Sequence, residues 1–313
     1  MKGYLIYPAT TPRKNNAFGW FQDAAAHNGI YLEVYFYNAP GMTAELESLP
    51  LPDFVFLRGY NTILSSWYES KGVRVINSTA SMILCRDKYL AGMAMKRCGV
   101  PVPMTIAEED LQAVSALRKI DVFSNFSEAY EAISNAMSCQ TFIMKQRFGS
   151  KGENVYLVEN VQDFEKAYLQ CRLTENSRQS QCGKDAELGV DSEEIALGSK
   201  LIFQEYISFS KGRDMRVWVF AGKVIGNILR YNDNSFKSNF AQGGAFRSEP
   251  LSSQAALVAI NAAAAVGLDF AGVDLLFLPD GRVTVCEVNG NPGFRTAGVD
   301  IPGRIFERVG EII

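Results

Sequence analysis

The sequence predicts a mixed α/β and α+β protein, with a small N-terminal domain around a parallel sheet and a larger domain of two subdomains. Strands and helices alternate over residues 1–85, as in a parallel sheet covered by helices. Hairpin patterns and further strands, separated by helices, follow in residues 86–313. A length of 313 residues, with 47% hydrophobic and 21% charged residues, suits two or three packed domains.

The elements of the N-terminal domain are bounded by turn residues. Helical patterns cover residues 17–29 and 63–72. No GxGxxG follows the first strand, so a dinucleotide-binding fingerprint is absent. The predicted strands are residues 2–8, 31–38, 53–59 and 73–77.

The larger domain is predicted to divide into a central subdomain, residues 86–203, and a C-terminal subdomain, residues 204–313. A polar stretch near residues 174–199 has few aromatic residues and predicts an insertion. The predicted helices cover residues 86–98, 126–138, 163–173, 252–268 and 300–313. The predicted strands lie in residues 141–160, 200–207, 214–220, 223–231 and 273–289.

Composition and charge exclude several classes of function. A net charge of −3 gives no electrostatic basis for binding nucleic acid or an anionic membrane. The N-terminal apolar run is too short for a signal peptide, and no later run could span a bilayer. Six scattered cysteines without a CxxC pair are typical of reduced thiols in a cytoplasmic protein. The single histidine, His27, precedes Asn28-Gly29, a pattern typical of a helix C-terminus, and excludes a zinc site built on histidines.

Two acidic residues stand inside apolar strands in VDLLFLPDGRVTVCEVNGNPG, residues 273–293. Asp280-Gly281 predicts a hairpin with a two-residue type I′ turn. Directly opposed side chains lie roughly 4.5–5.5 Å apart on one face of a sheet, and side chains along a strand alternate between faces. Pairing outward from the turn places Leu276 opposite Val285 and Asp274 opposite Glu287, with Asn289 on the face of Glu287.

Two opposed carboxylates at the end of a buried sheet repel each other, and burial raises the cost of their charges. Three arrangements relieve this repulsion: one acid holds a proton, a cation lies between the acids, or both face water at an edge. Carboxylate and amide oxygens, without sulfur or imidazole, suit Mg²⁺. Asp274, Glu287 and Asn289 are therefore candidate metal ligands.

Basic residues and a glycine loop indicate an anionic ligand. Lys145 stands inside an apolar strand, so it needs an anionic partner unless its amine extends to solvent. The loop Gly149-Ser150-Lys151-Gly152 can offer backbone N–H groups to phosphate oxygens. Together with the opposed acids, a further set predicts a site for polyphosphate, a divalent metal and a carboxylate: Lys88, Asp214, Arg216, Arg230, Lys237, Ser238 and Asn239.

The motifs of residues 86–304 follow one another as Arg86-Asp87-Lys88, Lys145 with GSKG, FQEYI, KGRDMRVWV, FKSNFAQGG, GLDFAGVDLL, CEVNGNPG and GVDIPGR. In these motifs the chain resembles the ATP-grasp enzymes, and most closely their RimK-like branch of alpha-L-glutamate ligase type. The resemblance implies a small pre-ATP-grasp domain followed by a two-subdomain ATP-grasp fold that clasps ATP. The N-terminal domain matches in architecture only.

The resemblance also implies roles for single residues. Contacts to the ATP phosphates are implied for Lys88, Lys145, Gly149, Ser150 and Gly152. Residues bordering the adenine are Glu205, Tyr206 and Ile207, and Lys211, Asp214 and Arg216 complete the nucleotide site. Asp274, Glu287 and Asn289 would hold two Mg²⁺ ions, with Mn²⁺ as an alternative, and Arg230, Lys237 and Asn239 would face the γ-phosphate and the bound carboxylate.

The chemistry implied is ATP-dependent ligation of a carboxylate to an amine through an acyl phosphate, giving a peptide or isopeptide bond. Two residues depart from the family pattern: Glu153 follows the glycine loop, and Gln242 stands where a basic residue is common. Exchanging Asp274 or Glu287 for its amide is expected to abolish turnover and to leave the fold intact. Arg58, at a strand end in FLRGYN, either reaches the substrate cleft or lies on the surface.

The substrates implied are a small-molecule or peptide carboxylate donor and an amine acceptor. Glutamate or another amino acid would be added to a peptide, a protein or a small amine, with no nucleic acid or membrane partner. Two alternatives remain: a nucleotide sensor of ATP-grasp fold without catalysis, and another ATP-grasp ligase of D-alanine or glutathione type. The sequence leaves a homo-oligomer open.

Overall fold

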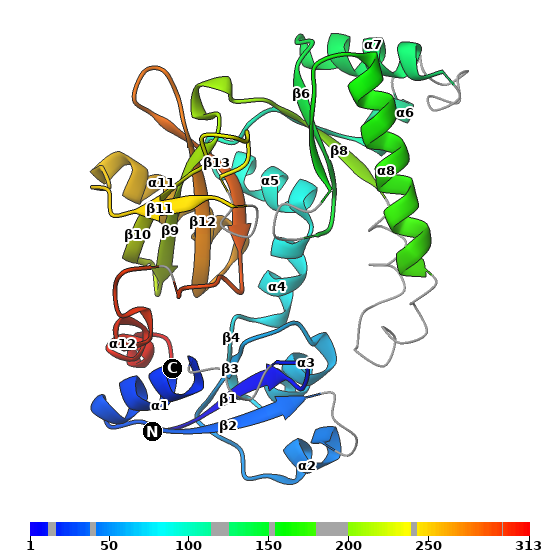
Figure 1. Ribbon diagram of the computed structural model, residues 1–313. Helices are drawn as coiled ribbons and strands as arrows, with labels where there is room; N and C mark the ends of the chain where they lie inside the picture. The colour runs from blue at the N-terminus through cyan, green and yellow to red at the C-terminus, as the bar shows by residue number, and fades with distance from the viewer. Residues whose placement is uncertain are drawn as a thin grey trace.

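Three sheets, formed by successive parts of the chain, organise the computed structural model (Figure 1). The structure describes residues 1–11, 17–37, 42–113, 125–149, 154–179, 200–238, 243–295 and 297–313. The first sheet is parallel and the other two are antiparallel, which confirms the predicted mixed class.

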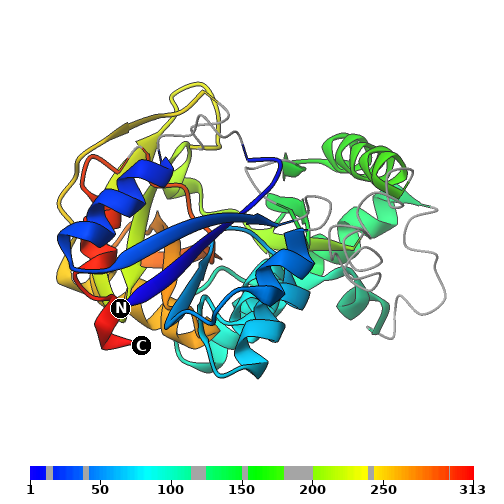
Figure 2. The same ribbon diagram turned by 90° about the horizontal axis from the view of Figure 1, so that it is seen from below.

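The N-terminal sheet contains β1 (Lys2–Pro8), β2 (Tyr31–Tyr37), β3 (Phe54–Leu57) and β4 (Arg74–Ile76), in the order β2-β1-β3-β4. Its connecting helices are α1 (Ala17–His27), α2 (Met42–Ser48) and α3 (Thr62–Ser70). Core side chains of α2 and α3 pack with one face of the sheet, whereas α1 packs with the other. That second face shares a core with the C-terminal sheet and α12 (Ile301–Phe306), and α1 lies against α12 (Figure 2).

Two consecutive helices, α4 (Thr79–Arg86) and α5 (Lys88–Arg97), leave the N-terminal sheet. The sequence does not predict α4, although Ser78 caps it by accepting a hydrogen bond from Ser81 N–H. The predicted domain division at residue 85 falls inside this helix. Both helices pack on α11 (Ser253–Val266) and the C-terminal sheet, although the predicted division counts α5 with the central subdomain.

The central sheet has the strand order β5-β8-β6-β7, with β5 (Thr105–Ala107), β6 (Phe142–Gln146), β7 (Val155–Val158) and β8 (Leu201–Glu205). It includes the predicted hairpin of β6 and β7. Helices α7 (Phe126–Met137) and α8 (Val161–Gln179) pack on it, and the short α6 (Glu108–Ala113) follows β5. Because α8 runs to Gln179, the first residues of the predicted polar insertion are helical, and its remainder lies outside the described residues.

The C-terminal sheet has the order β11-β10-β9-β12-β13. The strands are β9 (Arg213–Phe220), β10 (Lys223–Tyr231), β11 (Ala245–Arg247), β12 (Phe270–Phe277) and β13 (Val283–Asn289). The alanine-rich α11 packs on β12 and β13, and ends at Gly267 with φ +74°. Short 3₁₀ turns at Ser208–Ser210 and Val309–Glu311 complete the chain, and no helix of the described residues is long and apolar enough to cross a membrane.

The hairpin of β12 and β13 corrects part of the predicted register. Its turn is not type I′, because Gly281 has φ +81° but Asp280 has no positive φ. Leu278 N–H donates to the Arg282 carbonyl, so three residues lie between them and Leu276 faces Thr284 instead of Val285. A bulge that leaves out Cys286 then shifts the register back by one residue. The two shifts cancel, and Asp274 lies opposite Glu287 as predicted.

Candidate active site

A cleft with a cavity volume of about 130 Å³, open to solvent, is lined by residues of the central sheet, the C-terminal sheet and α5. Figure 1 shows α5 between these two sheets. Side chains of α5, β6, β7, β8, β9, β10, β12 and β13 line the cleft. The predicted site residues among its lining are Lys88, Lys145, Gly149, Glu205, Tyr206, Ile207, Asp214, Arg230, Lys237, Ser238, Asp274 and Glu287.

Other predicted residues lie elsewhere. Lys211, Arg216 and Asn289 do not line the cleft. Arg216 instead pairs with Asp274, as described below. Ser150, Gly152 and Asn239, as well as the departures Glu153 and Gln242, fall outside the described residues.

A buried cluster of two acids and two arginines lies at one wall, and all of its members except Arg216 line the cleft. Arg230, on β10, faces Asp214 on β9 and donates two hydrogen bonds to it, at 2.7 and 2.5 Å. Arg216 faces Asp274 in the same way across β9 and β12, with Nη2–Oδ2 at 2.8 Å. Arg230 Nη2 also lies 2.9 Å from Asp274 Oδ2, so Asp274 contacts both guanidinium groups. All four residues are at most 9% exposed.

Burial and neighbouring charge set the protonation of this cluster. Burial would raise the pKa of Asp274, but Arg216 and Arg230 bring that pKa below its ordinary value. For Asp214, burial raises the pKa, and the charge of Asp274 adds to the increase. The two acids also raise the pKa of Arg230 against the opposing effect of burial, so this arginine stays protonated.

The opposed acids therefore have different surroundings. Asp274 is 4% exposed, so an edge position with both acids facing water is wrong. In the structure the cations beside it are arginines. The Glu287 side chain is 28% exposed, and its Oε1 lies 3.9 Å from Lys88 Nζ. The two opposed carboxylates, and the Asn289 amide two residues beyond Glu287, are oxygen donors that suit a hard cation. Asn289 does not line the cleft, however, and a cation that binds Asp274 must replace part of the contact between Asp274 and the arginines.

Two lysines line the same cleft as these acids. Lys145 is 5% exposed, and its Nζ donates to Gln204 Oε1 at 2.8 Å. Within the described part of the chain, no carboxylate forms an ion pair with it. Lys88 Nζ donates to the Gly149 carbonyl at 2.5 Å. Burial lowers the pKa of Lys88, and the charge of Lys145 lowers it further against the effect of Glu287. A polyanion between the lysines would compensate both charges.

The start of α5 is tied to the end of β6, which places Lys88 close to Lys145. Asp87 caps α5 by accepting hydrogen bonds from Tyr89 N–H and Leu90 N–H. Arg147 donates to both oxygens of Asp87 at 2.8 Å, and its carbonyl accepts from Lys88 N–H at 3.2 Å. The sequence does not single out Arg147, because its partner is distant along the chain.

Several lining residues escape the sequence-based prediction. Cys286 faces the cleft beside Glu287 because the bulge breaks the alternation of β13. Burial raises the pKa of its thiol to about 11, so it is protonated at neutral pH. Apolar side chains offer faces for a planar ring. These apolar residues are Ile143, Val155, Phe236 and Leu276. The remaining lining residues are polar: Gln146, Gln204, Ser210 and Arg213.

Residues 112–309 match the RimK-like ATP-grasp domain family, which is more than half of the chain. The chain belongs to this family. It is 29% identical over 232 residues to N-acetylaspartylglutamate synthase A of Mus musculus, covering 72% of this chain and 50% of that protein. A probable alpha-L-glutamate ligase of Trichodesmium erythraeum (strain IMS101) is 28% identical over 253 residues, or 79% of this chain and 71% of the relative.

The fold is likewise that of solved ATP-grasp proteins. A structure of the ATP-grasp ligase PsnB complexed with a phosphomimetic variant of minimal precursor, Mg and ADP gives a TM-score of 0.61 at 17% identity. The match covers 99% of this chain and 98% of that chain. This likeness shows the predicted ATP-grasp fold. The chain spans about half the length of the first curated relatives it matches.

Arg58 and His27 both lie outside the cleft of this ATP-grasp chain. Arg58 neither reaches the cleft nor lies on the surface, because it is 8% exposed and buried between the N-terminal and C-terminal sheets. Its Nη2 donates to the Pro292 carbonyl at 2.9 Å. His27 is exposed at the last turn of α1, where its Nδ1 lies 2.7 Å from the Asp23 carbonyl. It takes no part in the cleft, as its position before Asn28-Gly29 predicts.

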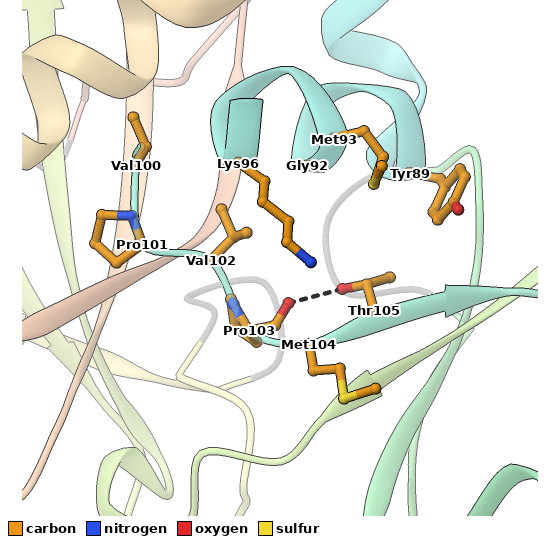
Figure 3. A pocket seen from close by; sticks show the side chains of 10 residues that line it. All are labelled: Tyr89, Gly92, Met93, Lys96, Val100, Pro101, Val102, Pro103, Met104 and Thr105. Carbon is orange, nitrogen blue, oxygen red and sulfur yellow. Dashed lines mark hydrogen bonds between the residues drawn. The ribbon is translucent and has the colours of Figure 1, made fainter. Parts of the chain in front are cut away.

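A second pocket lies between α5 and the segment that leads into β5 (Figure 3). Its walls are mostly apolar, and none of the predicted site residues lines it. The Lys96 side chain points toward Pro103 and Thr105, whose Oγ1 donates to the Pro103 carbonyl at 3.0 Å. The pocket shares α5 with the cleft but is separate from it.

Proposed function

We propose that the protein is an ATP-dependent carboxylate–amine ligase that forms a peptide or isopeptide bond through an acyl phosphate. The observation that carries this proposal is the charge arrangement of the cleft. Lys145 is buried without a carboxylate partner among the described residues, Lys88 has only Glu287 at 3.9 Å, and the opposed acids Asp274 and Glu287 line the same cleft. Such an arrangement suits a nucleotide polyphosphate bound together with a divalent cation.

Placing ATP in the cleft assigns a role to each wall. Lys88 and Lys145 bind the phosphates, together with the backbone of the loop that begins at Gly149. The exposed end of β8 presents backbone groups of Tyr206 and Ile207 to the adenine edge. The apolar side chains of Ile143 and Leu276 fit the adenine faces. Lys211, just after the 3₁₀ turn, can act only at the rim of this site.

Asp274 and Glu287 are proposed as ligands of Mg²⁺, with Mn²⁺ as a substitute and two ions as the full complement. Bound ions neutralise the charge of a transferring phosphoryl group. Asp274 can serve only after exchanging part of its contact with Arg216 and Arg230. Asn289 is the third proposed ligand, two residues beyond Glu287 on the same strand.

The reaction proposed has two steps. A carboxylate oxygen attacks the γ-phosphorus, the bond from that phosphorus to the β-phosphate oxygen breaks, and ADP leaves. An amine then attacks the acyl carbon, phosphate leaves, and the amine loses a proton. Arg230 lines the cleft, and its raised pKa keeps it cationic, so it can stabilise the oxyanion of the second step. Lys237 and Asn239 are proposed to face the same phosphoryl and carboxylate groups.

The relatives' names, N-acetylaspartylglutamate synthase A and alpha-L-glutamate ligase, suggest glutamate as one substrate. The other substrate is a small molecule or a peptide, which supplies either the carboxylate or the amine. The proposed location of the protein is the cytoplasm. A chain that only senses the nucleotide, or a ligase of D-alanine or glutathione type, would bind ATP in the same cleft. Trapping the acyl group distinguishes these alternatives.

The test incubates the protein with Mg²⁺, ATP, hydroxylamine and a pool of amino acids and small carboxylic acids, and detects hydroxamates and ADP by mass spectrometry. The expected result is one hydroxamate formed with equivalent ADP, whose mass identifies the donor. Glu287→Gln is the matched control and should form none. Binding of ATP without any ADP or hydroxamate, over pools that include peptides and glutamate, would contradict the ligase and favour a sensor.

A further inference from the structure

The loop after β13 is held by its backbone carbonyls. Asn77 Nδ2 donates to the Gly290 carbonyl at 2.7 Å, and Arg58 Nη2 donates to the Pro292 carbonyl at 2.9 Å. Trp218 Nε1, from β9, donates to the Gly293 carbonyl at 3.0 Å. This loop, residues 290–293, directly follows Asn289. Two of its three side-chain donors come from the N-terminal sheet.

The two donors from the N-terminal domain, Arg58 and Asn77, lie at the ends of strands of the parallel sheet. Arg58 directly follows β3 and Asn77 directly follows β4, and these strands are neighbours. Neighbouring parallel strands end at the same edge, so both side chains meet the loop there. Asn77 also fixes the start of β12: its Nδ2 donates to the Phe270 carbonyl at 2.7 Å, and its Oδ1 accepts from Phe270 N–H at 2.7 Å. One amide therefore spans the beginning of β12 and the end of β13.

The loop has little room to move. A Cβ atom added at Gly290 would lie 2.6 Å from Met82 Sδ, and one added at Gly272 would lie 2.5 Å from Pro292 Cβ. The loop thus packs closely against α4 on one side and β12 on the other. Close packing and three hydrogen-bonded carbonyls fix the loop, and through it the position of the preceding residue, Asn289.

We propose that Arg58 and Asn77 are positioning residues, through which the N-terminal sheet sets the geometry of the metal ligands on β12 and β13. The inference rests on the proposed function, because it takes Asp274, Glu287 and Asn289 as those ligands. Neither side chain lines the cleft, so each acts only through the backbone it holds. Partners that orient metal ligands typically change metal affinity 10- to 100-fold when removed.

Arg58 allows positioning to be separated from stability. Its guanidinium lies 5.4–5.9 Å from the ring centres of Phe21, Phe56, Phe270 and Phe294. Among the described residues, Nε and Nη1 have no hydrogen-bond partner. Replacing Arg58 by methionine removes a buried charge that lacks a full set of partners, which offsets the loss of one hydrogen bond. Arg58→Met therefore removes the hydrogen bond to Pro292 without an expected fall in Tm.

The experiment uses the full chain and titrates Mn²⁺ by electron paramagnetic resonance in the presence of a non-hydrolysable ATP analogue. Arg58→Met is expected to bind Mn²⁺ about 10- to 100-fold more weakly than the wild type, with Tm unchanged or raised. The matched control is Arg74→Met. Arg74 also joins the N-terminal sheet to the C-terminal one, through Asp269 at 2.7 Å, but does not touch the loop, so its Mn²⁺ affinity should match the wild type.

A second measurement concerns the loop itself. Amide hydrogen exchange of the ligand-free protein should be faster at residues 289–294 in Arg58→Met, and unchanged there in Arg74→Met. If Arg58→Met binds Mn²⁺ with wild-type affinity, the positioning inference is overturned, but the proposed function is not. A wild-type protein that binds no Mn²⁺ with the nucleotide analogue overturns the proposed function, and the inference with it. Equal loss of affinity in Arg74→Met shows a general effect of the domain contact and also overturns the inference.

Discussion

Replacing Asp274 by asparagine removes the negative charge that Arg216 and Arg230 share. The Asp274 side chain is 5% exposed, and the two guanidinium groups are 11% and 10% exposed, so water can compensate little of the loss. Breaking a buried ion pair by removing one partner costs about 3–5 kcal/mol. At roughly 2–4 °C per kcal/mol for a domain of 150–250 residues, Tm is expected to fall by about 6–20 °C.

The assay is thermal unfolding at pH 7, followed by circular dichroism, with Asp280→Asn as the matched control. Asp280 belongs to the same hairpin and also pairs with an arginine, Arg282, but that pair is exposed, so Tm should not change. The structure therefore adds an expected loss of stability to the prediction that Asp274→Asn abolishes turnover with the fold intact. If Asp274→Asn melts at the temperature of Asp280→Asn, the buried arginine pairs do not stabilise the fold as argued.

The pH dependence of the same variant provides a second check. The pKa of Asp274 is lowered in the folded state, so its ion pairs stabilise the protein above the ordinary aspartate pKa, about 3.9. This contribution is lost as pH falls through the lowered pKa. The Tm difference between wild type and Asp274→Asn should therefore be constant near neutral pH and decrease in acid. A difference that grows on acidification would contradict the assigned direction.

Three further predictions concern the cleft. Glu287→Gln, at a partly exposed position, should keep the wild-type Tm but lose Mn²⁺ binding in the nucleotide complex, and unchanged binding would rule out a metal role. Lys145→Met should bind ATP about 10- to 100-fold more weakly by calorimetry without losing stability, because Lys145 is buried without an ion pair among the described residues. The control Lys223→Met, at an exposed position, should bind ATP as the wild type does. Alkylation of Cys286 by iodoacetamide should accelerate with pH toward about 11 and slow when ATP is bound, and a rate that levels off near pH 8 would contradict its raised pKa.

Most of the fold follows from local patterns in the sequence. Alternating strands and helices predict the parallel sheet, and alanine-rich or capped segments predict helices such as α5 and α11. The short elements α4 and β11 escape prediction because eight and three residues give too little periodicity. The Asp280-Gly281 pair predicts a hairpin correctly but not its loop length, which depends on how Leu278 and Arg282 pair.

The sequence predicts which residues form the candidate site, but not which of their side chains pair with one another. Motif residues such as Lys145 and Glu287 stand out because polar groups in apolar strands need partners. Which partner each finds depends on strand order, and only the placement of β9 between β10 and β12 brings Arg216 and Arg230 to Asp274. The opposed acids were correctly paired because the longer turn and the bulge at Cys286 compensate each other.

The partners of Arg58 and Asn77 lie beyond what the sequence can predict. Each residue marks a strand end in its local pattern, which explains why Arg58 is expected either at the cleft or on the surface. Its actual partner, Pro292, is 234 residues away, and Asn77 contacts Gly290 over 213 residues. Such contacts exist only once the N-terminal sheet packs on the C-terminal one. If Arg58 and Asn77 set the metal geometry as proposed, the N-terminal domain contributes to the cleft without lining it, and its variants should alter metal binding more than nucleotide binding.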